Sequence, residues 1–237
     1  FRANLANDDW IARTPLTESR VDDVNEVYEA TLGGYVLRDR LWFFLAGRDF
    51  ETTATEPFFG AGSGNYVAGQ TQERYEAKLT VSPHVSHRFI GSYMEIDTVQ
   101  TNYNFYTPLH FDVIDPERSL PQEFWTVNYT GVLTESFFAE AQYAEREFTF
   151  SDSGGDAEPG DRINGTHIYF FPVDAEAGSP LFCAPCGDEN RNMENLLAKG
   201  SYFLATEGMG THDLSFGYDS YTDIRLSNNY QSPSNFN

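Results

Sequence analysis

The sequence feature that most constrains the fold is an alternating pattern between Val27 and Phe50, VYEATLGGYVLRDRLWFFLAGRDF. Apolar or small side chains recur at every second position in both halves, and a charged tripeptide at 38–40 separates the halves. Strict alternation indicates a half-buried β-strand, and a short polar break between two such runs indicates a hairpin. Each arm has about ten residues, which is nearly twice the usual strand length and close to the length that a tilted strand needs to cross a bilayer.

The same unit recurs three times further along the chain. Short turns separate alternating runs in the pairs 70–82 with 87–97, 123–133 with 137–150, and 200–207 with 212–223. Surface loops are expected between the hairpins at 52–69, 98–121 and 151–197, and the last is the longest. Short turns that alternate with long loops are typical of outer-membrane barrels, because lipid tolerates only sheets whose backbone groups are all paired by closure.

The fold class that follows is all-β: an antiparallel transmembrane β-barrel, of which this chain supplies about eight strands in four hairpins. Eight strands can close a small barrel, but loops of this length favour an arc of a larger one. Residues 1–24 are expected to be an incoming strand end and a loop, residues 25–231 the barrel hairpins, and residues 151–197 a long extracellular loop. The chain begins with Phe1 and shows no signal-peptide pattern, so we expect a processed protein or a piece of a longer one.

The composition combines many aromatic rings with a low overall hydropathy. Aromatic residues make up 16% of the chain, whereas the mean hydropathy is −0.47. A wall that is apolar on one side, with rings where lipid meets water, produces this combination. Tyr28, Trp42, Phe50 and Trp125 are therefore predicted to be membrane-interface aromatics, although a soluble β core could use the same rings. No apolar run approaches the length of a transmembrane helix.

The net charge of −21 at pH 7 argues against nucleic acid as a partner, because no basic stripe is present to displace counterions. Acidic loops are either plain solvated surface or hold divalent cations. Asp152, Asp156 and Asp161 offer oxygen ligands for calcium but lack the spacing of an EF-hand. A flexible acidic loop is the favoured interpretation, so no cofactor or metal is expected, with calcium at these three residues as the weaker alternative.

The two cysteines, Cys183 and Cys186, lie in the motif CAPC. A zinc site would need further ligands at a suitable spacing, and a thioredoxin motif would open a helix after a strand. This motif lies instead in a segment rich in glycine, proline and aspartate. A local disulfide in an oxidising compartment is the prediction.

A set of polar residues is predicted to face the barrel lumen if the aromatic faces meet lipid. The set is Glu76, Lys78, Glu140, Gln142 and Arg146. These side chains either contact a ligand or a plug, or they form the wet polar wall that every such barrel has, and the second interpretation is favoured. No nucleophile elbow or metalloprotease motif is present, and the chain is not expected to be an enzyme.

Three segments resemble TonB-dependent outer-membrane receptors. EATLGGYVLRDRLWFF resembles the segment in which a Gly-Gly pair, a charged turn and an aromatic run open an early barrel hairpin, although Tyr35 stands where the family usually has proline. YEAKLTVSPHVSHRFIGSY is similar to the next hairpin. DENRNMENLLAKGSYFLATEGMGTHDLSFGYDSYTDIRLSNNYQSPSNF resembles the Oar-like branch, which has a carboxypeptidase-regulatory-like domain ahead of the plug.

The resemblance implies a 22-stranded barrel with a plugged lumen, in which this chain is roughly the first half of the wall and the plug lies outside it. It implies a bacterial outer-membrane location, contact with lipid and lipopolysaccharide, and uptake of a scarce ligand of unknown identity. Energy would come from the TonB complex through the N-terminal part of the parent protein. A larger envelope assembly is a further partner to consider.

Two other functions remain open. An outer-membrane structural or adhesion protein would use acidic, calcium-binding surface loops and have no import role. The N-terminus of the parent protein separates it from a transporter, which needs a plug and a coupling box. A secreted, soluble β-sandwich binding module is the third alternative, and it predicts two packed sheets and extraction without detergent.

Overall fold

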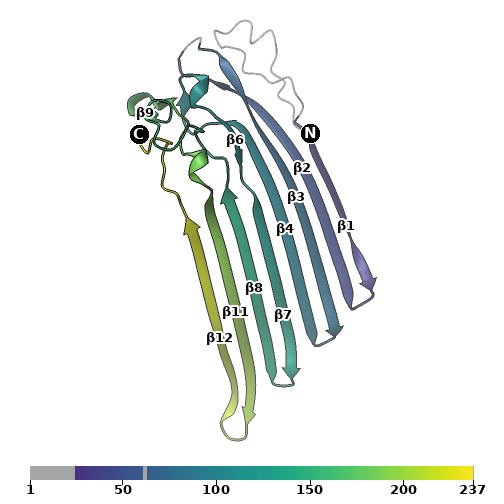
Figure 1. Ribbon diagram of the computed structural model, residues 1–237. Coiled ribbons are helices and arrows are strands. Elements are labelled where there is room, and N and C mark those ends of the chain that lie inside the picture. The colour runs from purple at the N-terminus through teal and green to yellow at the C-terminus, as the bar shows by residue number, and fades with distance from the viewer. Residues whose placement is uncertain (1–24, 61–62, 237) are drawn as a thin grey trace.

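The computed structural model describes residues 25–60 and 63–236, and in this part of the chain the protein is all-β. Figure 1 shows a broad sheet of long strands with a small folded region at one end. The strand end and loop predicted for residues 1–24 lie outside the described residues.

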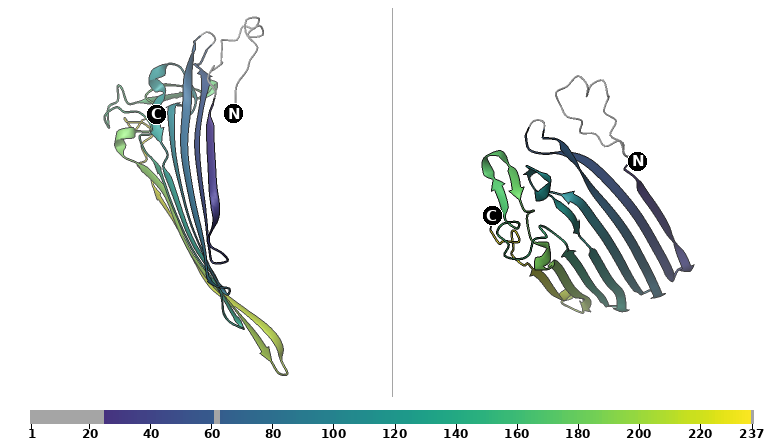
Figure 2. Two further views of the ribbon diagram at one scale, coloured as in Figure 1. Left: turned by 90° about the vertical axis from the view of Figure 1, so that its right-hand side faces the viewer. Right: turned by 45° about the horizontal axis from the view of Figure 1, so that its top comes forward.

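Eight long strands form the continuous path of the large sheet, in the order β1-β2-β3-β4-β7-β8-β11-β12. Their bounds are β1 Val27–Leu37, β2 Leu41–Pro57, β3 Asn65–His84, β4 His87–Tyr103, β7 Gln122–Thr134, β8 Phe137–Phe150, β11 Glu189–Thr206 and β12 Gly210–Leu226. All neighbours pair antiparallel, and the short β6, Asp115–Ser119, pairs with the end of β4. The predicted all-β antiparallel fold in hairpins is confirmed, and Figure 2 shows one curved layer.

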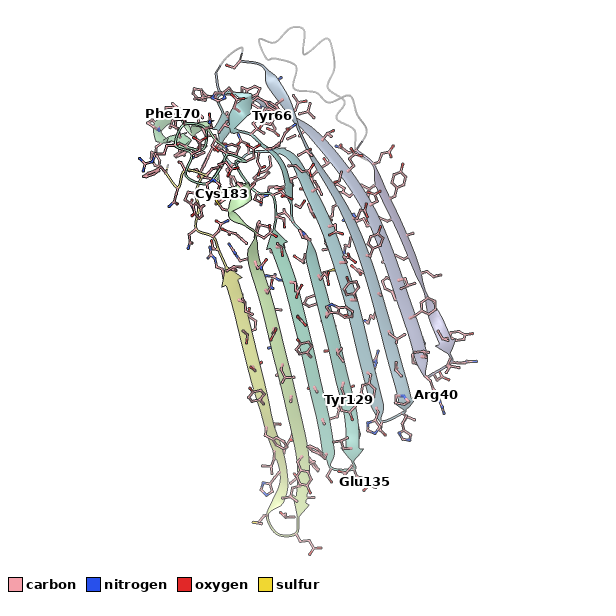
Figure 3. All side chains as sticks on the ribbon, viewed as in Figure 1. Arg40, Tyr66, Tyr129, Glu135, Phe170 and Cys183 are labelled. Carbon is pink, nitrogen blue, oxygen red and sulfur yellow. A yellow bond between two sulfur atoms is a disulfide. The ribbon has the colours of Figure 1, made fainter. Side chains whose placement is uncertain are left out.

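The four tight turns of the hairpins lie at one end of the sheet and the long connections at the other. Arg40 and Glu135 mark the turn end in Figure 3, while Phe170 and Cys183 mark the opposite end. In the first turn Asp39 has φ 63, a left-handed conformation that the short polar side chain of aspartate tolerates. The last turn reaches the same region through Gly208 and Gly210, where glycine has no steric cost.

The strands are longer than the sequence pattern predicted, so the expected loop bounds are wrong at three places. β2 and β3 stay paired through Thr52–Pro57 and Asn65–Gly69, which leaves only 58–64 as the connection. β4 continues to Tyr103, and β11 begins at Glu189, inside the loop predicted at 151–197. Polar and small residues predominate in these extensions and large apolar residues such as Tyr66, Val99 and Met193 are sparse, so regular hydrophobic alternation is lost although backbone pairing continues.

The register assigns each side chain of the sheet to one of two faces, because cross-strand partners point to the same side. One face, here called the belt face, carries Leu45, Leu79, Val127, Leu196 and Phe216 on successive hairpins. The opposite face, here called the polar face, carries all the lysine and arginine side chains of the long strands, whereas acidic side chains lie on both faces. Among the described residues no protein layer covers the belt face: Leu32 is 63% exposed, Val127 51% and Phe216 60%.

Residues 104–121, 151–188 and 227–236 fold together at the end of the sheet and are here called the cap. The cap contains a small sheet of β5 (Thr107–Pro108), β10 (Ala175–Gly178) and β9 (His167–Phe170), and three single-turn 3₁₀ helices at Phe111–Val113, Phe171–Val173 and Ala184–Cys186. Most of the buried apolar residues belong to it, including Val113, Ile114, Ala175 and Cys183. The cap is therefore a compact unit, whereas the sheet has almost no core of its own.

The large sheet has two open edges. Within the described residues β1 pairs only with β2 and β12 only with β11, so the sheet does not close on itself. Nearly every residue of both edge strands is exposed. Long, exposed edge strands offer unpaired backbone donors and acceptors for another strand.

None of the helices in the described ranges is long and apolar enough to cross a membrane.

Candidate functional site: a pocket between the cap and the sheet

The five polar residues singled out from the sequence come together on one face. Glu76 and Lys78 of β3 and Glu140, Gln142 and Arg146 of β8 all lie on the polar face by register. Glu76 forms an ion pair with Arg74 of the same strand. Arg146 Nη2 donates a hydrogen bond to the carbonyl oxygen of Arg191 at 3.3 Å. These contacts hold the side chains against the sheet.

The four aromatic residues predicted for membrane interfaces do not share a face. Tyr28 and Trp125 lie on the belt face, whereas Trp42 and Phe50 lie on the polar face, opposite Thr80 and Gln72 of β3. The reason is the register of the first hairpin, which pairs Trp42 with Tyr35 and Phe50 with Val27. The alternation in 27–50 showed which residues share a face within each strand. It did not show which face of one strand matches which face of the other.

The belt face has its own row of aromatic rings, which the sequence pattern only partly indicated. Tyr75, Tyr93, Trp125 and Tyr143 lie at neighbouring positions on β3, β4, β7 and β8, and Tyr28 lies on β1, separated from Tyr75 by Gly47 and Asp49 of β2. The phenols of four of these rings donate to carboxylates two positions away: Tyr28 to Glu26, Tyr75 to Glu73 at 3.0 Å, Tyr93 to Glu95 at 3.0 Å and Tyr143 to Glu145 at 2.9 Å. Each such ring therefore connects the apolar belt to an acidic row nearer the cap.

The three calcium candidates are not gathered into a cluster. Among the residues that the structure describes, no three His, Cys, Asp or Glu side chains are arranged to hold a metal ion, so Asp152, Asp156 and Asp161 do not form a site together. Asp161 instead accepts hydrogen bonds from Ile163 N, Asn164 N and Asn164 Nδ2 at 2.9, 3.1 and 2.7 Å. These bonds, above all the one from the Asn164 side chain, lower the pKa of Asp161.

Cys183 and Cys186 form the local disulfide expected from CAPC. The bridge closes the 3₁₀ turn Ala184–Cys186 and lies in the cap, at the Cys183 label of Figure 3. It stands directly between Phe182 and Gly187, and both of these residues line the pocket described next.

A pocket of about 240 Å³ lies where the cap meets the polar face, and is here called the Arg118 pocket. Its walls come from β6, from the cap-side ends of β8 and β11, and from three stretches of the cap. The lining residues are Phe105, Arg118, Phe150, Ser153, Phe182, Gly187, Glu189, Arg191 and Asn228. Apolar rings with a few convergent polar groups are the usual composition of a small-molecule site.

Arg118 is the most unusual residue of this pocket. Its side chain is 94% buried, since its relative exposure is 6%, and its guanidinium lies 4.3 Å from the ring centroid of Tyr103 and 5.6 Å from those of Phe105 and Phe150. Its Nε is buried without a hydrogen-bond partner. Within residues 25–60 and 63–236 the guanidinium makes no hydrogen bond and no ion pair, so aromatic faces are its main support.

Arg191, the second cation of the pocket, is fully engaged by contrast. Its Nη2 pairs with Glu189 Oε2 at 2.7 Å, and its Nη1 donates to the carbonyl oxygens of Asn190 and Leu226 at 2.8 Å each. Ser227 Oγ donates to the other oxygen of Glu189 at 2.8 Å. Arg191 is therefore paired with a carboxylate, whereas among the described residues Arg118 has no ion pair and no side-chain hydrogen bond.

Asp115 lies three residues before Arg118 on β6 and ties the strand to the cap. Its Oδ2 accepts a hydrogen bond from Gly154 N at 2.8 Å, and its Oδ1 is buried without a partner. Burial raises the pKa of Asp115 to about 7, although the Gly154 hydrogen bond and the Arg118 charge act in the opposite direction. Asp115 and Arg118 thus act on each other through their charges, although they form no ion pair.

A buried hydrogen-bonded pair stabilises the cap behind the pocket. His167 Nε2 and Glu176 Oε2 are 2.8 Å apart, and the two residues are 1% and 0% exposed. Glu176 Oε1 also accepts from Tyr106 N at 3.3 Å, and Glu176 O accepts from Leu109 N at 2.9 Å. This pair joins the neighbouring strands β9 and β10, and Glu176 also connects them to the segment around β5, about 70 residues earlier in the sequence.

Sequence reasoning missed the Arg118 pocket and the His167–Glu176 pair completely. Arg118 lies in DPERS and His167 in NGTHIYF, two short stretches without periodicity or motif. The residues around each come from segments separated by 30 to 70 positions, as in the Gly154–Asp115 and Tyr106–Glu176 hydrogen bonds. No local pattern brings such segments together.

Comparison with known proteins adds no relative. No protein-family model matches the chain, and no significant match is found among curated proteins or among solved structures.

Proposed function

We propose that this chain is part of the wall of an outer-membrane β-barrel that serves as a TonB-dependent receptor of the Oar-like type and takes up a scarce ligand. The single observation that carries the proposal is the apolar belt of the sheet, which no protein layer covers. Large apolar side chains exposed across a whole sheet face are rare in soluble monomers and are the rule where strands meet lipid.

The dimensions and borders of the belt support a lipid-facing role. On β3 the belt runs from Tyr75 to Val81, about 20 Å at the rise of an extended strand, near the height of about 25 Å known for outer-membrane barrels. The row of tyrosines and Trp125 borders it on the cap side, as interfacial rings do.

The distribution of charge between the two faces supports the same assignment. All eight basic residues of the long strands lie on the polar face by register: Arg48, Arg74, Lys78, Arg88, Arg146, Arg191, Lys199 and Arg225. A buried cation in the lipid-facing belt would cost several kcal/mol. The polar face is therefore suited to line an aqueous lumen, which agrees with the role expected for Glu76, Lys78, Glu140, Gln142 and Arg146.

The open edges and the placement of the connections complete the support. β1 and β12 each offer one unpaired edge, and in lipid such edges must be closed by further strands. All four tight turns lie at one end and the cap at the other, which is the arrangement of periplasmic turns and extracellular loops. The motif resemblance at residues 29–44 and 188–236 points to the TonB-dependent class within this architecture.

The deciding experiment is fractionation of cells that make the full-length protein, followed by its mass and its interaction with the energy-coupling system. We expect a detergent-dependent, heat-modifiable species far heavier than 26.8 kDa in the outer membrane, retained on the immobilised periplasmic domain of TonB. A species that remains soluble without detergent would overturn the barrel proposal. A detergent-dependent species without TonB binding would favour the adhesion alternative.

A further inference from the structure

The Arg118 pocket combines apolar walls with a buried guanidinium that has no hydrogen bond or ion pair among the described residues, and we propose that it binds a small organic carboxylate with one flat apolar ring. The proposal rests on the proposed function only in placing the cap outside the membrane, where solutes reach it. The proposal assigns a class of ligand to the Arg118 pocket, whose lining residues all belong to this chain.

The buried positive charge of Arg118 favours an anionic ligand. Burying an arginine costs free energy unless its N–H groups and its charge find partners. Arg118 is only 6% exposed, and its Nε has no hydrogen-bond partner among the described residues. Stacking on Tyr103 at 4.3 Å occupies a face of the guanidinium and leaves its in-plane donors free. A carboxylate matches this planar fork and forms charge-assisted hydrogen bonds to it.

The aromatic walls of the pocket favour a ligand whose anionic group is attached to a flat apolar ring. The rings of Phe105, Phe150 and Phe182 contribute to the lining, and Phe105 and Phe182 meet edge to face at 5.4 Å and 80°. Aromatic pairs of this geometry accept a further ring by offset or edge contact. A volume of about 240 Å³ is at the small end for ligand pockets, so it suits a single ring and an acidic group.

The pocket is held in shape before any ligand arrives. Phe182 has φ 74, a left-handed backbone that is rare for a bulky residue and is found preferentially where ligands are held. Its N–H donates to Gln231 O at 2.9 Å, and its carbonyl oxygen accepts from Gly155 N at 3.1 Å. The disulfide at Cys183 fixes the next residue. A preorganised wall lowers the ordering cost of binding.

The test uses the full-length protein in detergent micelles and phenylacetate as the probe, measured by ligand-observed NMR with empty micelles as the blank. We expect saturable binding of phenylacetate and at least tenfold weaker binding of phenylacetamide, which has the same ring and shape but no charge. Arg118→Met should weaken phenylacetate binding by about 10- to 100-fold. Arg88→Met, which removes an exposed arginine at the turn end of the polar face, should leave it unchanged.

Equal binding of the acid and the amide, or no binding of the acid, would overturn the proposal, and neither result depends on a variant that folds. Arg118→Lys supplies the second variant, because it keeps the charge but loses the planar fork, and we expect a loss smaller than that of Arg118→Met. Loss of probe binding in a protein that still fractionates with the outer membrane would remove the pocket assignment alone. Detergent-free solubility would remove the proposed function instead.

Discussion

The large sheet and the cap belong to one chain but are stabilised by different means. The sheet depends on ladders of backbone hydrogen bonds between neighbouring strands and buries almost no side chains, and Ala144 is a rare buried apolar residue there. The cap buries Val113, Ile114 and Ala175 together with the His167–Glu176 pair, and it is closed by a disulfide.

The difference shows which surroundings each region requires. The cap has a core of the kind that folds in water, where apolar burial supplies the driving force. Within the described residues the sheet leaves its apolar belt uncovered, and in the barrel that we propose this belt would meet lipid. Perturbations of one region should accordingly leave the other intact, and the following predictions test that separation.

The largest effect is expected from Glu176→Leu in the cap. The change leaves His167 with no partner for either ring nitrogen and removes the acceptor of Tyr106 N. Disrupting a buried pair in this way costs about 3–5 kcal/mol. Hydrogen exchange read by mass spectrometry should show loss of protection in residues 104–121 and 151–188 with β2, β3 and β4 unchanged. Glu176→Gln, which retains hydrogen-bonding atoms, is the matched control.

The next effect is expected from a charge in the belt. Val127 and Asn128 are neighbours on β7 that lie on the belt and polar faces respectively. Val127→Arg should lower the free energy of unfolding from lipid vesicles by about 2–4 kcal/mol, because the new cation meets lipid near the middle of the belt. Asn128→Arg should change it little. Urea titration of the full-length protein in vesicles measures both, and equal losses would contradict the assignment of the faces.

A pH-dependent effect is expected at Asp115. The pKa of this group is about 7 in the folded cap and about 3.9 in an unfolded chain, so the folded state binds more protons between these values. The contribution of Asp115 to cap stability is therefore greatest below about pH 4 and falls as pH rises through 7. Asp115→Asn should stabilise the cap by up to about 4 kcal/mol at pH 8, and the gain should shrink progressively toward pH 4.

Hydrogen exchange of the Gly154 amide, which donates to Asp115 Oδ2, measures this effect locally when followed from pH 5 to pH 8 in both proteins. A pH-independent difference between Asp115→Asn and the wild type would show that the aspartate does not titrate in this window.

The smallest effect is expected from opening the disulfide. Cys183 and Cys186 are separated by only 3 positions, and a short loop gains little from cross-linking, about 2 kcal/mol. Cys186→Ser should loosen the cap around Phe182 and leave the sheet as it was. Limited proteolysis with and without reductant measures the change, and Asn228→Ala, a pocket residue outside the bridge, controls for general loosening.

The sheet was largely predictable from sequence and the cap was not. Strict alternation in runs such as 70–82 and 123–133 sets strand, face and turn through a period that is local to each strand. The phase between two arms is not local, so the sequence did not show that Trp42 and Phe50 lie on the face opposite to Tyr28 and Trp125. The register that decides it is set by the turn at 38–40 and by a shift between Tyr35 and Leu37.

The cap escaped prediction because its contacts join distant segments that have no pattern of their own. Phe182 N bonds to Gln231 O, and Ser234 N bonds to Gly165 O, each across more than forty residues of sequence. The acidic residues at 152–161 were interpreted as a flexible loop or calcium ligands, whereas Asp161 organises a local turn through its hydrogen bonds to Ile163 and Asn164. Arg118 carried no sequence signal, because its role depends on rings of other segments.

The order of the strands also determines how the molecule can assemble in time. The long strands lie in the sheet in the same order as in the chain. Each hairpin can therefore be added next to the one made before it, and the entropy cost of closing each tight turn is small. The cap follows another rule, because its last segment, 227–236, supplies the partners of Gly165 and Phe182 only after β12 has been made. In synthesis from the N-terminus, the cap and the Arg118 pocket, which Asn228 helps to line, can therefore be completed only after all four hairpins have been made.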